Sequence, residues 1–197
     1  MNIALSSELI DMRDRDVAMR ARLLHENRLY DDYAEEMQQI HIANACRLNE
    51  LVTQYGWPTM SLVGLEGCRA AWLVAQHSIC TPDLQREFLC LLTEAAKTGG
   101  VPDLQVAFLT DRVRACERKP QIYGTVFDWN ENGELSCDVE DLANLDARRR
   151  QVGLPAFAVD LASHRKDVAA EGGNPPRDFE QAKRRRLEWS KRVGWID

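Results

Sequence analysis

The sequence predicts a mainly α-helical fold: a helical domain around a central apolar helix, with a small β-hairpin and a docked C-terminal helix. Two observations lead to this fold class. Apolar residues recur at three- and four-residue steps through most of the chain. Alternating sequence rich in Tyr, Thr, Val and Phe is confined to one segment near 121–139. We expect residues 1–171 to form one domain, and residues 172–197 to form a linker and a helix packed on it.

The first two predicted helices run from Ser7 to about His25 and from about Asp31 to Tyr55. The second ends at Gly56-Trp57-Pro58, because glycine caps helices and proline cannot continue them. The apolar positions that support these helices are Leu9, Met12, Val17, Met19, Leu23 and Leu24 in the first, and Met37, Ile40, Ala43 or Asn44, Leu48, Leu51 and Val52 in the second.

The third predicted helix, Gly64 to His77, is apolar on most of its sides, and such a helix is expected at the centre of a domain. Thr81-Pro82 opens a fourth helix with an N-cap and a first-turn proline, and Gly99-Gly100 stops it. A fifth helix follows from Pro102 or Asp103 to about Cys116.

The segment from Gln121 to Trp129 alternates, the turn sequence of residues 130–133 follows, and residues 134–139 are short and extended. This order predicts a β-hairpin. Beyond it, a short helix over 140–151 and a helix over 159–169 precede a Gly- and Pro-rich linker at 172–176. The last helix, about Asp178 to Val193, places Phe179 and Trp189 on one stripe.

The composition is that of an ordinary globular chain: 197 residues, 45% hydrophobic and 28% charged. No apolar run approaches the roughly 20 residues that span a bilayer, and the N-terminus lacks the basic and apolar regions of a signal peptide. We therefore expect a cytoplasmic protein with no membrane partner. The six cysteines are scattered; their even number permits a disulfide framework, but we favour free buried thiols.

The net charge of −6 is unevenly distributed. Residues 148–197 carry 12 Lys and Arg against 7 Asp and Glu, whereas the rest of the chain carries 13 against 24. A basic tail is typical of a nucleic-acid arm, but an acidic body repels phosphate backbones. We favour a tail that docks on its own body, and do not expect nucleic acid as a partner.

Polar residues that a helical core does not need form four clusters. Gln76 and His77 end the central helix, where the helix dipole favours an imidazolium suited to proton transfer, although a structural His that bonds the last carbonyls is an alternative. Asp111 and Arg112 point about 100° apart on one helix, so each needs another partner. Arg112 offers a fork of donors to an anion, and a structural ion-pair network is the alternative.

The best signal for a site is Gln121-x-Tyr123-Gly124-Thr125. Alternation sends the amide, the phenol and the hydroxyl to one face, and Gly124 permits close approach of another group. Arg148 and Arg149, after Asp146, either bind an anion or are solvated surface charges. His77-x-x-Cys80 has metal-like spacing, but no second ligand pair accompanies it, so we expect no metal and no other cofactor.

Taken together, these clusters resemble the bacterial family of uncharacterised proteins known as domain of unknown function 6624. The stretches that carry the resemblance are Asp16 to Arg20, 55–58, Val63-Gly64, 71–77, 109–113, 121–125, 145–149 with 152–155, Glu188-Trp189 and 193–195. The family pattern tends to have Gln where this chain has Val126. The resemblance implies no activity, but it favours one shared site.

The sequence supports three hypotheses for function. In the first, a metal-independent enzyme acts on a polar, anionic small molecule: His77 is the general acid/base, Tyr123 assists it, and the remaining site residues bind the substrate. Those residues are Gln76, Asp111, Arg112, Gln121, Gly124, Thr125, Arg148 and Arg149. In the second, the protein is a non-catalytic module, such as an immunity or regulatory protein, whose acidic body binds a protein partner. In the third, which we rank last, the tail binds nucleic acid.

Overall fold

The computed structural model describes residues 1–30 and 33–197 and divides into two compact units. Unit 1 comprises Met1–Leu109 and unit 2 comprises Thr110–Asp197. The predicted boundary near residue 171 lies inside unit 2. The structure confirms the expected fold class, because it is mainly helical with one small antiparallel hairpin.

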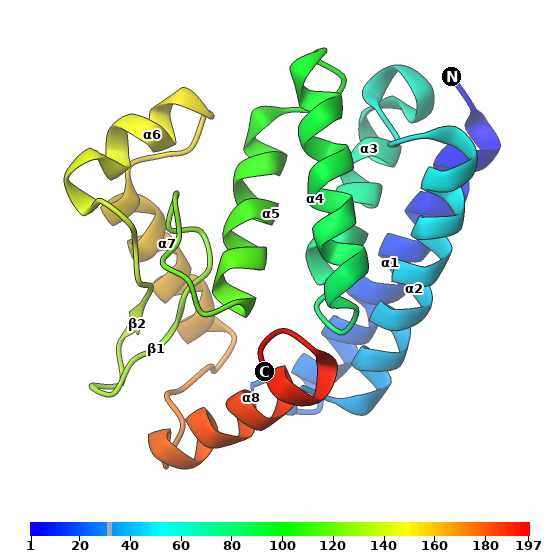
Figure 1. The fold of residues 1–197 in the computed structure, drawn as a ribbon. Helices are drawn as coiled ribbons and strands as arrows, with labels where there is room; N and C mark the ends of the chain where they lie inside the picture. Colours follow the sequence, from blue (N-terminus) through cyan, green and yellow to red (C-terminus); the bar gives the residue numbers. More distant parts are fainter. Residues whose placement is uncertain (31–32) are drawn as a thin grey trace. The chain divides into compact units, whose positions relative to one another are not determined.

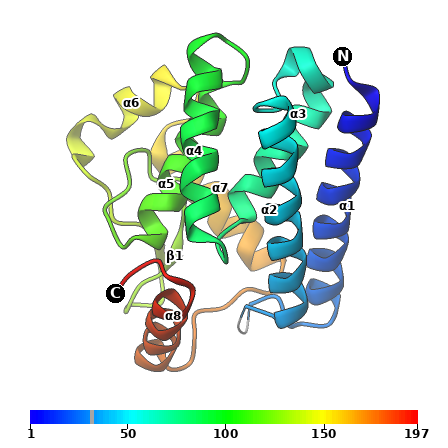
Figure 2. The ribbon, with the colours of Figure 1, turned by 45° about the vertical axis from the view of Figure 1, so that its right-hand side comes forward.

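Unit 1 is a helical bundle. Its elements are α1 (Ile3–His25), α2 (Glu35–Tyr55), α3 (Met60–His77), α4 (Pro82–Lys97) and the first part of α5 (Asp103–Cys116). Consecutive helices from α1 to α4 lie side by side and run in opposite directions (Figures 1 and 2). Asp31, where the second helix was expected to begin, lies outside the described residues; α2 itself begins at Glu35.

Helix α3 is central to unit 1, as its apolar sequence predicts. It packs against α1, α2 and α4, and it buries small residues on several sides, including Gly67, Ala70 and Ala71. A Cβ at Gly67 would lie 2.7 Å from Ser6 Oγ, so glycine permits the close approach of α1 at this point. The predicted start of the helix at Gly64 is instead a kink with φ of 74°, preceded by one more helical turn.

Unit 2 contains β1 (Asp128–Trp129), β2 (Leu135–Ser136), a short 3-10 turn (Leu142–Asn144), α6 (Leu145–Gln151), α7 (Phe157–Ala170) and α8 (Phe179–Val193). The hairpin pairs Asp128 with Ser136 and Trp129 with Leu135. Helix α7 packs against both α6 and β2. Trp195, just after α8, is 4% exposed, so the end of the chain is buried rather than extended into solvent.

The first half of the expected hairpin is a loop rather than a strand. Strand pairing is confined to two residues on each side, apart from one bridge between Gln121 and Val139. Residues 122–126 are looped, and Gly124 has a φ of 64°. Alternation therefore does not place the side chains of Gln121, Tyr123 and Thr125 on one strand face. The reason is that buried side chains, described below, occupy the backbone groups that a second strand would need.

Two sequence expectations concern compartment. Cys46, Cys68, Cys90 and Cys137 are free thiols, but only Cys68 among them is buried, whereas Cys46 and Cys90 are exposed. The expectation of buried thiols is wrong for these two, because they lie on outer faces of α2 and α4.

Among the helices of the described residues, none combines the length and apolar character required to cross a bilayer.

Candidate functional site

A buried polar centre lies in unit 1, where three helices each contribute one side chain. Asp16 of α1 is 2% exposed and His41 of α2 is 7% exposed. Asp16 follows Leu9 and Met12 on the buried stripe of α1, and His41 follows Met37 on that of α2. Both polar residues thus occupy positions where the helical period calls for an apolar side chain. His77, the last residue of α3, is the third member.

The carboxylate of Asp16 joins the two imidazoles, and we call these three residues the His–Asp–His centre. His77 Nδ1 donates a hydrogen bond to Asp16 Oδ2 at 2.6 Å. His41 Nε2 lies 3.3 Å from Asp16 Oδ1, at ion-pair distance but without hydrogen-bond alignment. The other ring nitrogen of His41, Nδ1, is hydrogen-bonded to the hydroxyl of Tyr33. The two imidazole centroids are 4.9 Å apart.

This environment keeps Asp16 ionised. Burial alone raises the pKa of a carboxyl group, but the hydrogen bond from His77, the close approach of His41 and the positive charge that the two imidazoles can carry outweigh burial. The pKa of Asp16 consequently lies well below its usual range. A buried carboxylate that stays charged holds a neighbouring imidazole in one orientation and stabilises it when it becomes protonated.

His77 is the member of the centre with the greatest access to solvent. Its side chain is 28% exposed, against 8% for His41 and 3% for Asp16. Its neighbour Gln76 is buried: Nε2 donates to Phe108 O at 3.1 Å, and Oε1 has no hydrogen-bond partner among the described residues. The two neighbours that the sequence singled out therefore differ in exposure: the Gln76 amide is buried and the His77 imidazole is partly exposed.

The same three side chains are the described residues that could hold a metal ion, with one ligand atom from each within 4.8 Å of the others. Two histidines and one carboxylate are a common ligand set for zinc or iron. In the geometry observed, however, His77 Nδ1 and Asp16 Oδ2 are 2.6 Å apart. Ligand atoms that share one metal at bond lengths near 2.1 Å lie farther apart, at roughly 3 Å or more. A metal bound by these two atoms would therefore require their hydrogen bond to open.

The predicted residues of unit 2 form a second buried polar cluster, around the loop 121–126. Asp111, 0% exposed, accepts four hydrogen bonds from this loop's backbone N–H groups. The donors are Ile122 N at 2.8 Å, Tyr123 N at 3.1 and 3.2 Å, and Thr125 N at 3.0 Å. Thr125 Oγ1 also donates to it at 3.0 Å. Asp111 is thus an anchor for the loop backbone.

Gln121 closes the same loop from its first residue. Its Oε1 accepts from the N–H groups of Thr125 and Val126 at 3.0 and 2.9 Å, and its Nε2 donates to Val126 O at 2.7 Å. One amide therefore satisfies both types of backbone group. This local closure explains why the segment forms no strand.

Two arginines hold the carbonyl side of the loop. Arg148 Nε donates to Ile122 O at 3.0 Å. Arg149, which is 0% exposed, donates to the carbonyls of Tyr123, Gly124 and Pro155 and forms an ion pair with Asp160. The loop is thus bound by a carboxylate on its N–H side and by guanidinium groups on its C=O side.

Gly124 is required at the centre of this loop for two reasons. Its φ of 64° is in the left-handed region, and a Cβ atom there would lie 2.9 Å from Phe157 Cε2. We call the side chains that bind this loop, Asp111, Gln121, Arg148 and Arg149, the clamp. Arg112 is not part of it. Arg112 lines a cavity of unit 2, and its Nε is buried with no acceptor among the residues described. For Tyr123, it is the backbone that the clamp uses.

Sequence reasoning found one member of the His–Asp–His centre and most of the unit 2 cluster. It missed Asp16, His41 and Tyr33. A signal was available for the first two, because each interrupts a buried apolar stripe at the correct helical spacing. The expected convergence of Gln76 and His77 with the residues of unit 2 stays a prediction, as do the substrate-binding roles of those residues.

Comparison with known proteins gives one match. The family model described as a family of unknown function (DUF6624) matches residues 3–164. Neither the curated proteins nor the solved structures contain a match to this chain. The family match includes Asp16, His41, His77 and the whole loop 121–126. Since it covers most of the 197 residues, the chain belongs to the DUF6624 family, as the resemblance of its motifs indicated.

Proposed function

We propose that the protein is an enzyme that acts on a polar, anionic small molecule by general acid/base catalysis, with His77 as the proton carrier. The observation that supports this proposal is the 2.6 Å hydrogen bond from His77 Nδ1 to the buried carboxylate of Asp16. The carboxylate keeps the hydrogen on Nδ1, so a neutral His77 ring carries its basic lone pair on Nε2.

Proton uptake at Nε2 is favoured by the charge already present in the centre. The imidazolium that forms on His77 remains hydrogen-bonded to an ionised Asp16, whose pKa is held low. Partial exposure of the His77 side chain, at 28%, gives a substrate access that the buried His41 does not have. In this proposal Tyr33 holds the His41 ring beside Asp16, and His77 exchanges the proton.

The proposal also covers anion binding, metal dependence and cellular location. Arg112, with its buried Nε lacking an acceptor among the described residues, is the residue whose geometry best fits anion binding. We propose that catalysis needs no metal, since the close contact between His77 and Asp16 is that of a hydrogen-bonded pair. We also propose that the protein is bacterial, as its resemblance to a bacterial family implies. We place it in the cytoplasm, because exposed free thiols such as Cys46 and Cys90 are typical of a reducing compartment.

The proposal is tested by a turnover screen of the full chain against anionic esters, amides and phosphate esters, with product detected by mass spectrometry. His77→Gln should lower the rate on any substrate found by about 10²- to 10⁴-fold, the usual contribution of general acid/base catalysis. His25→Gln is the matched control, because His25 is an exposed histidine of the same unit. Turnover that survives in His77→Gln would contradict the assignment of the proton carrier.

A chelator arm of the same screen tests metal independence. Turnover should be unchanged after prolonged treatment with EDTA. Loss of turnover that Zn²⁺ or Fe²⁺ restores would instead make Asp16, His41 and His77 the ligands of a catalytic metal, the arrangement that their proximity also permits.

A non-catalytic protein-binding module is the second candidate. The observation in its favour is the acidic character of unit 1, which holds 15 Asp and Glu against 9 Lys and Arg. Such a surface attracts basic partners over a range of about 10 Å at 0.1 M salt. Two results together would favour this candidate over catalysis. The turnover screen would find no substrate, and the full chain would capture a basic protein through unit 1 with an affinity that falls as salt is added.

A further inference from the structure

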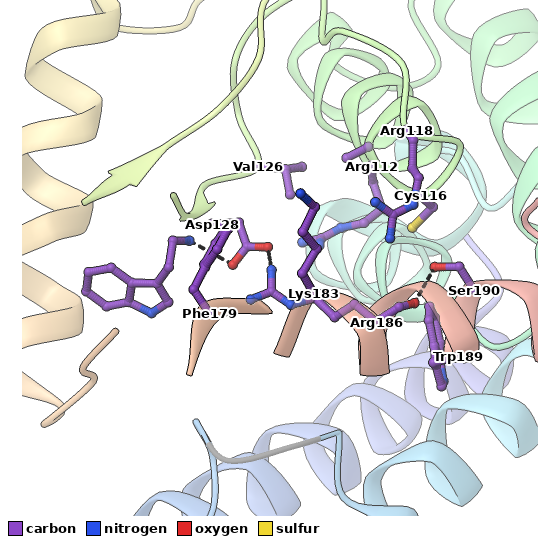
Figure 3. Close-up of a pocket in the computed structure, with 12 residues that line it drawn as sticks. Arg112, Cys116, Arg118, Val126, Asp128, Phe179, Lys183, Arg186, Trp189 and Ser190 are labelled. Carbon is purple, nitrogen blue, oxygen red and sulfur yellow. Dashed lines mark hydrogen bonds and ion pairs between the residues drawn. The ribbon is translucent and has the colours of Figure 1, made fainter. Parts of the chain in front are cut away.

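Unit 2 contains a cavity of about 410 Å³ next to the clamped loop. It is lined by the end of α5, by Val126, by β1 and by α8 (Figure 3). The volume is at the lower end of the range for small-molecule pockets, roughly 300–1,000 Å³. None of its lining residues belongs to the His–Asp–His centre.

Four cationic side chains line this cavity, against one carboxylate. Arg112 and Arg118 come from the end of α5 and the residues just after it, and Lys183 and Arg186 come from α8. In Figure 3 these side chains extend into the same space from α5, from the turn after it and from α8. The one carboxylate, Asp128, forms an ion pair with Arg186.

The other three cations lack close carboxylate partners. Within residues 1–30 and 33–197, no carboxylate forms an ion pair with Arg112 or Arg118, and the Nε of Arg112 is buried without an acceptor. Lys183 reaches only Glu180 Oε1, at 4.0 Å. Leaving a buried guanidinium N–H without an acceptor is costly, so this position is suited to a ligand oxygen.

The concentration of positive charge is local. Unit 2 as a whole holds equal numbers of basic and acidic side chains, 16 of each. Within the cavity, burial and the nearby charge of Arg118 lower the pKa of Arg186 below its ordinary value. Like charges that are held together in this way repel one another, and a bound anion would relieve that repulsion.

We propose that this cavity binds a small organic phosphate. The phosphate would lie between Arg112, Arg118 and Lys183, since guanidinium forks match phosphate oxygens and a lysine adds a point charge. The organic part would lie against Val126 and Phe179, the latter already beneath Lys183 Nζ at 6.0 Å. The proposal extends the anion binding suggested for Arg112 to a defined cavity and adds Arg118 and Lys183, and it does not depend on His77.

A small ligand fits these observations better than a nucleic acid. The cations line one pocket of about 410 Å³, whereas a nucleic-acid surface needs a basic stripe that follows the backbone over several nucleotides. The equal numbers of acidic and basic residues in unit 2 also provide little long-range attraction for a polyanion.

The test is calorimetric titration of the full chain with AMP and inorganic pyrophosphate at low salt, with adenosine as the uncharged match to AMP. Arg112→Gln and Lys183→Gln should each weaken AMP binding about tenfold or more, while adenosine should not bind measurably. Arg184→Gln is the matched control, because Arg184 is an exposed arginine of α8 that does not line the cavity; it should leave binding within about twofold.

The proposal would be overturned if neither AMP nor pyrophosphate bound, or if Arg184→Gln weakened binding as much as Lys183→Gln. It would also be overturned if an oligothymidylate bound more tightly than AMP with an affinity that grew with strand length, the mark of a nucleic-acid surface. Lys183 is exposed, so its variant should fold even if Arg112→Gln does not. AMP binding that is weakened in Lys183→Gln and kept in Arg184→Gln would assign the ligand to this cavity, whatever the outcome of the turnover screen.

Discussion

Each of the two compact units buries one aspartate almost completely: Asp16 is 2% exposed and Asp111 is 0% exposed. Their partners differ in kind. Asp16 faces two imidazoles, the side-chain type that most often transfers protons in enzymes, whereas Asp111 accepts from backbone N–H groups and a hydroxyl, which do not act as acids or bases here. Burial of a carboxylate therefore does not by itself identify a reactive centre. The chemistry of its partners does.

The two clusters also differ in solvent access. His77 keeps 28% of its side chain exposed at the end of a helix, so the His–Asp–His centre is open at one member. In unit 2 the loop is held by Arg149, whose side chain is fully buried and bound to three carbonyls and a carboxylate. We conclude that Asp111 and Arg149 build a scaffold, and that Asp16 supports a group able to react.

The largest effect is expected for Asp111→Asn. An asparagine would turn an NH₂ group toward backbone donors and remove the negative charge they bind, so the free energy of unfolding should fall by about 3 to 5 kcal/mol. Urea denaturation followed by circular dichroism measures it. Asp167→Asn, on the exposed face of α7, should change it by less than about 0.5 kcal/mol. Equal effects of the two substitutions would remove Asp111 from the scaffold.

Arg149→Lys should lower the free energy of unfolding by about 3 kcal/mol. A lysine keeps the charge but cannot place separate donors on the carbonyls of Tyr123, Gly124 and Pro155. Arg150→Lys is the matched control, because the adjacent arginine is exposed. If thermal melting shows Arg149→Lys to be as stable as Arg150→Lys, then the positive charge of Arg149 suffices. Its separate hydrogen bonds to the carbonyls would then contribute little to stability.

Asp16→Asn should cost less, about 2 kcal/mol at neutral pH, and its effect should depend on pH. A carboxyl group whose folded-state pKa is depressed contributes stability above its unfolded pKa of about 3.9, and this contribution is lost as pH falls toward the folded value. The stability difference from wild type should therefore shrink as the solution is acidified below about pH 5, where the carboxyl group of the unfolded chain begins to take up a proton. Denaturant titrations between about pH 3 and 7 would show it, and a difference that grew on acidification would have the wrong sign.

A pair of glycines, with expected losses of about 1 and 2 kcal/mol, tests how tightly the loop is packed. Gly153→Ala meets no atom within 4 Å but has a φ of 79°, so it should cost about 1 kcal/mol of unfolding free energy from backbone strain alone. Gly124→Ala has similar strain and also places Cβ 2.9 Å from Phe157, so it should cost about 1 kcal/mol more. Equal losses in both variants would mean that Phe157 moves aside freely.

The helices followed from the sequence with few errors, and so did the family. Helix α3 ends at His77 and α5 at Cys116, as their periodicity and flanking residues predict. The loop 121–126 was the main error in local structure, because its alternation resembles a strand. Two of the residues that prevent pairing there, Asp111 and Arg149, lie ten or more positions away in the sequence, so no local pattern could show their effect. The third, Gln121, acts from within the segment.

What the sequence determined by itself is the set of helices and the list of unusual polar residues, since helical period, capping and composition are local properties. Which of those residues meet was decided by tertiary structure. Asp16, His41 and His77 are brought together only because three helices pack with those positions facing inward. A carboxylate in an apolar stripe indicates that a partner exists, but the identity of that partner, imidazole or backbone amide, depends on packing between segments distant in the chain.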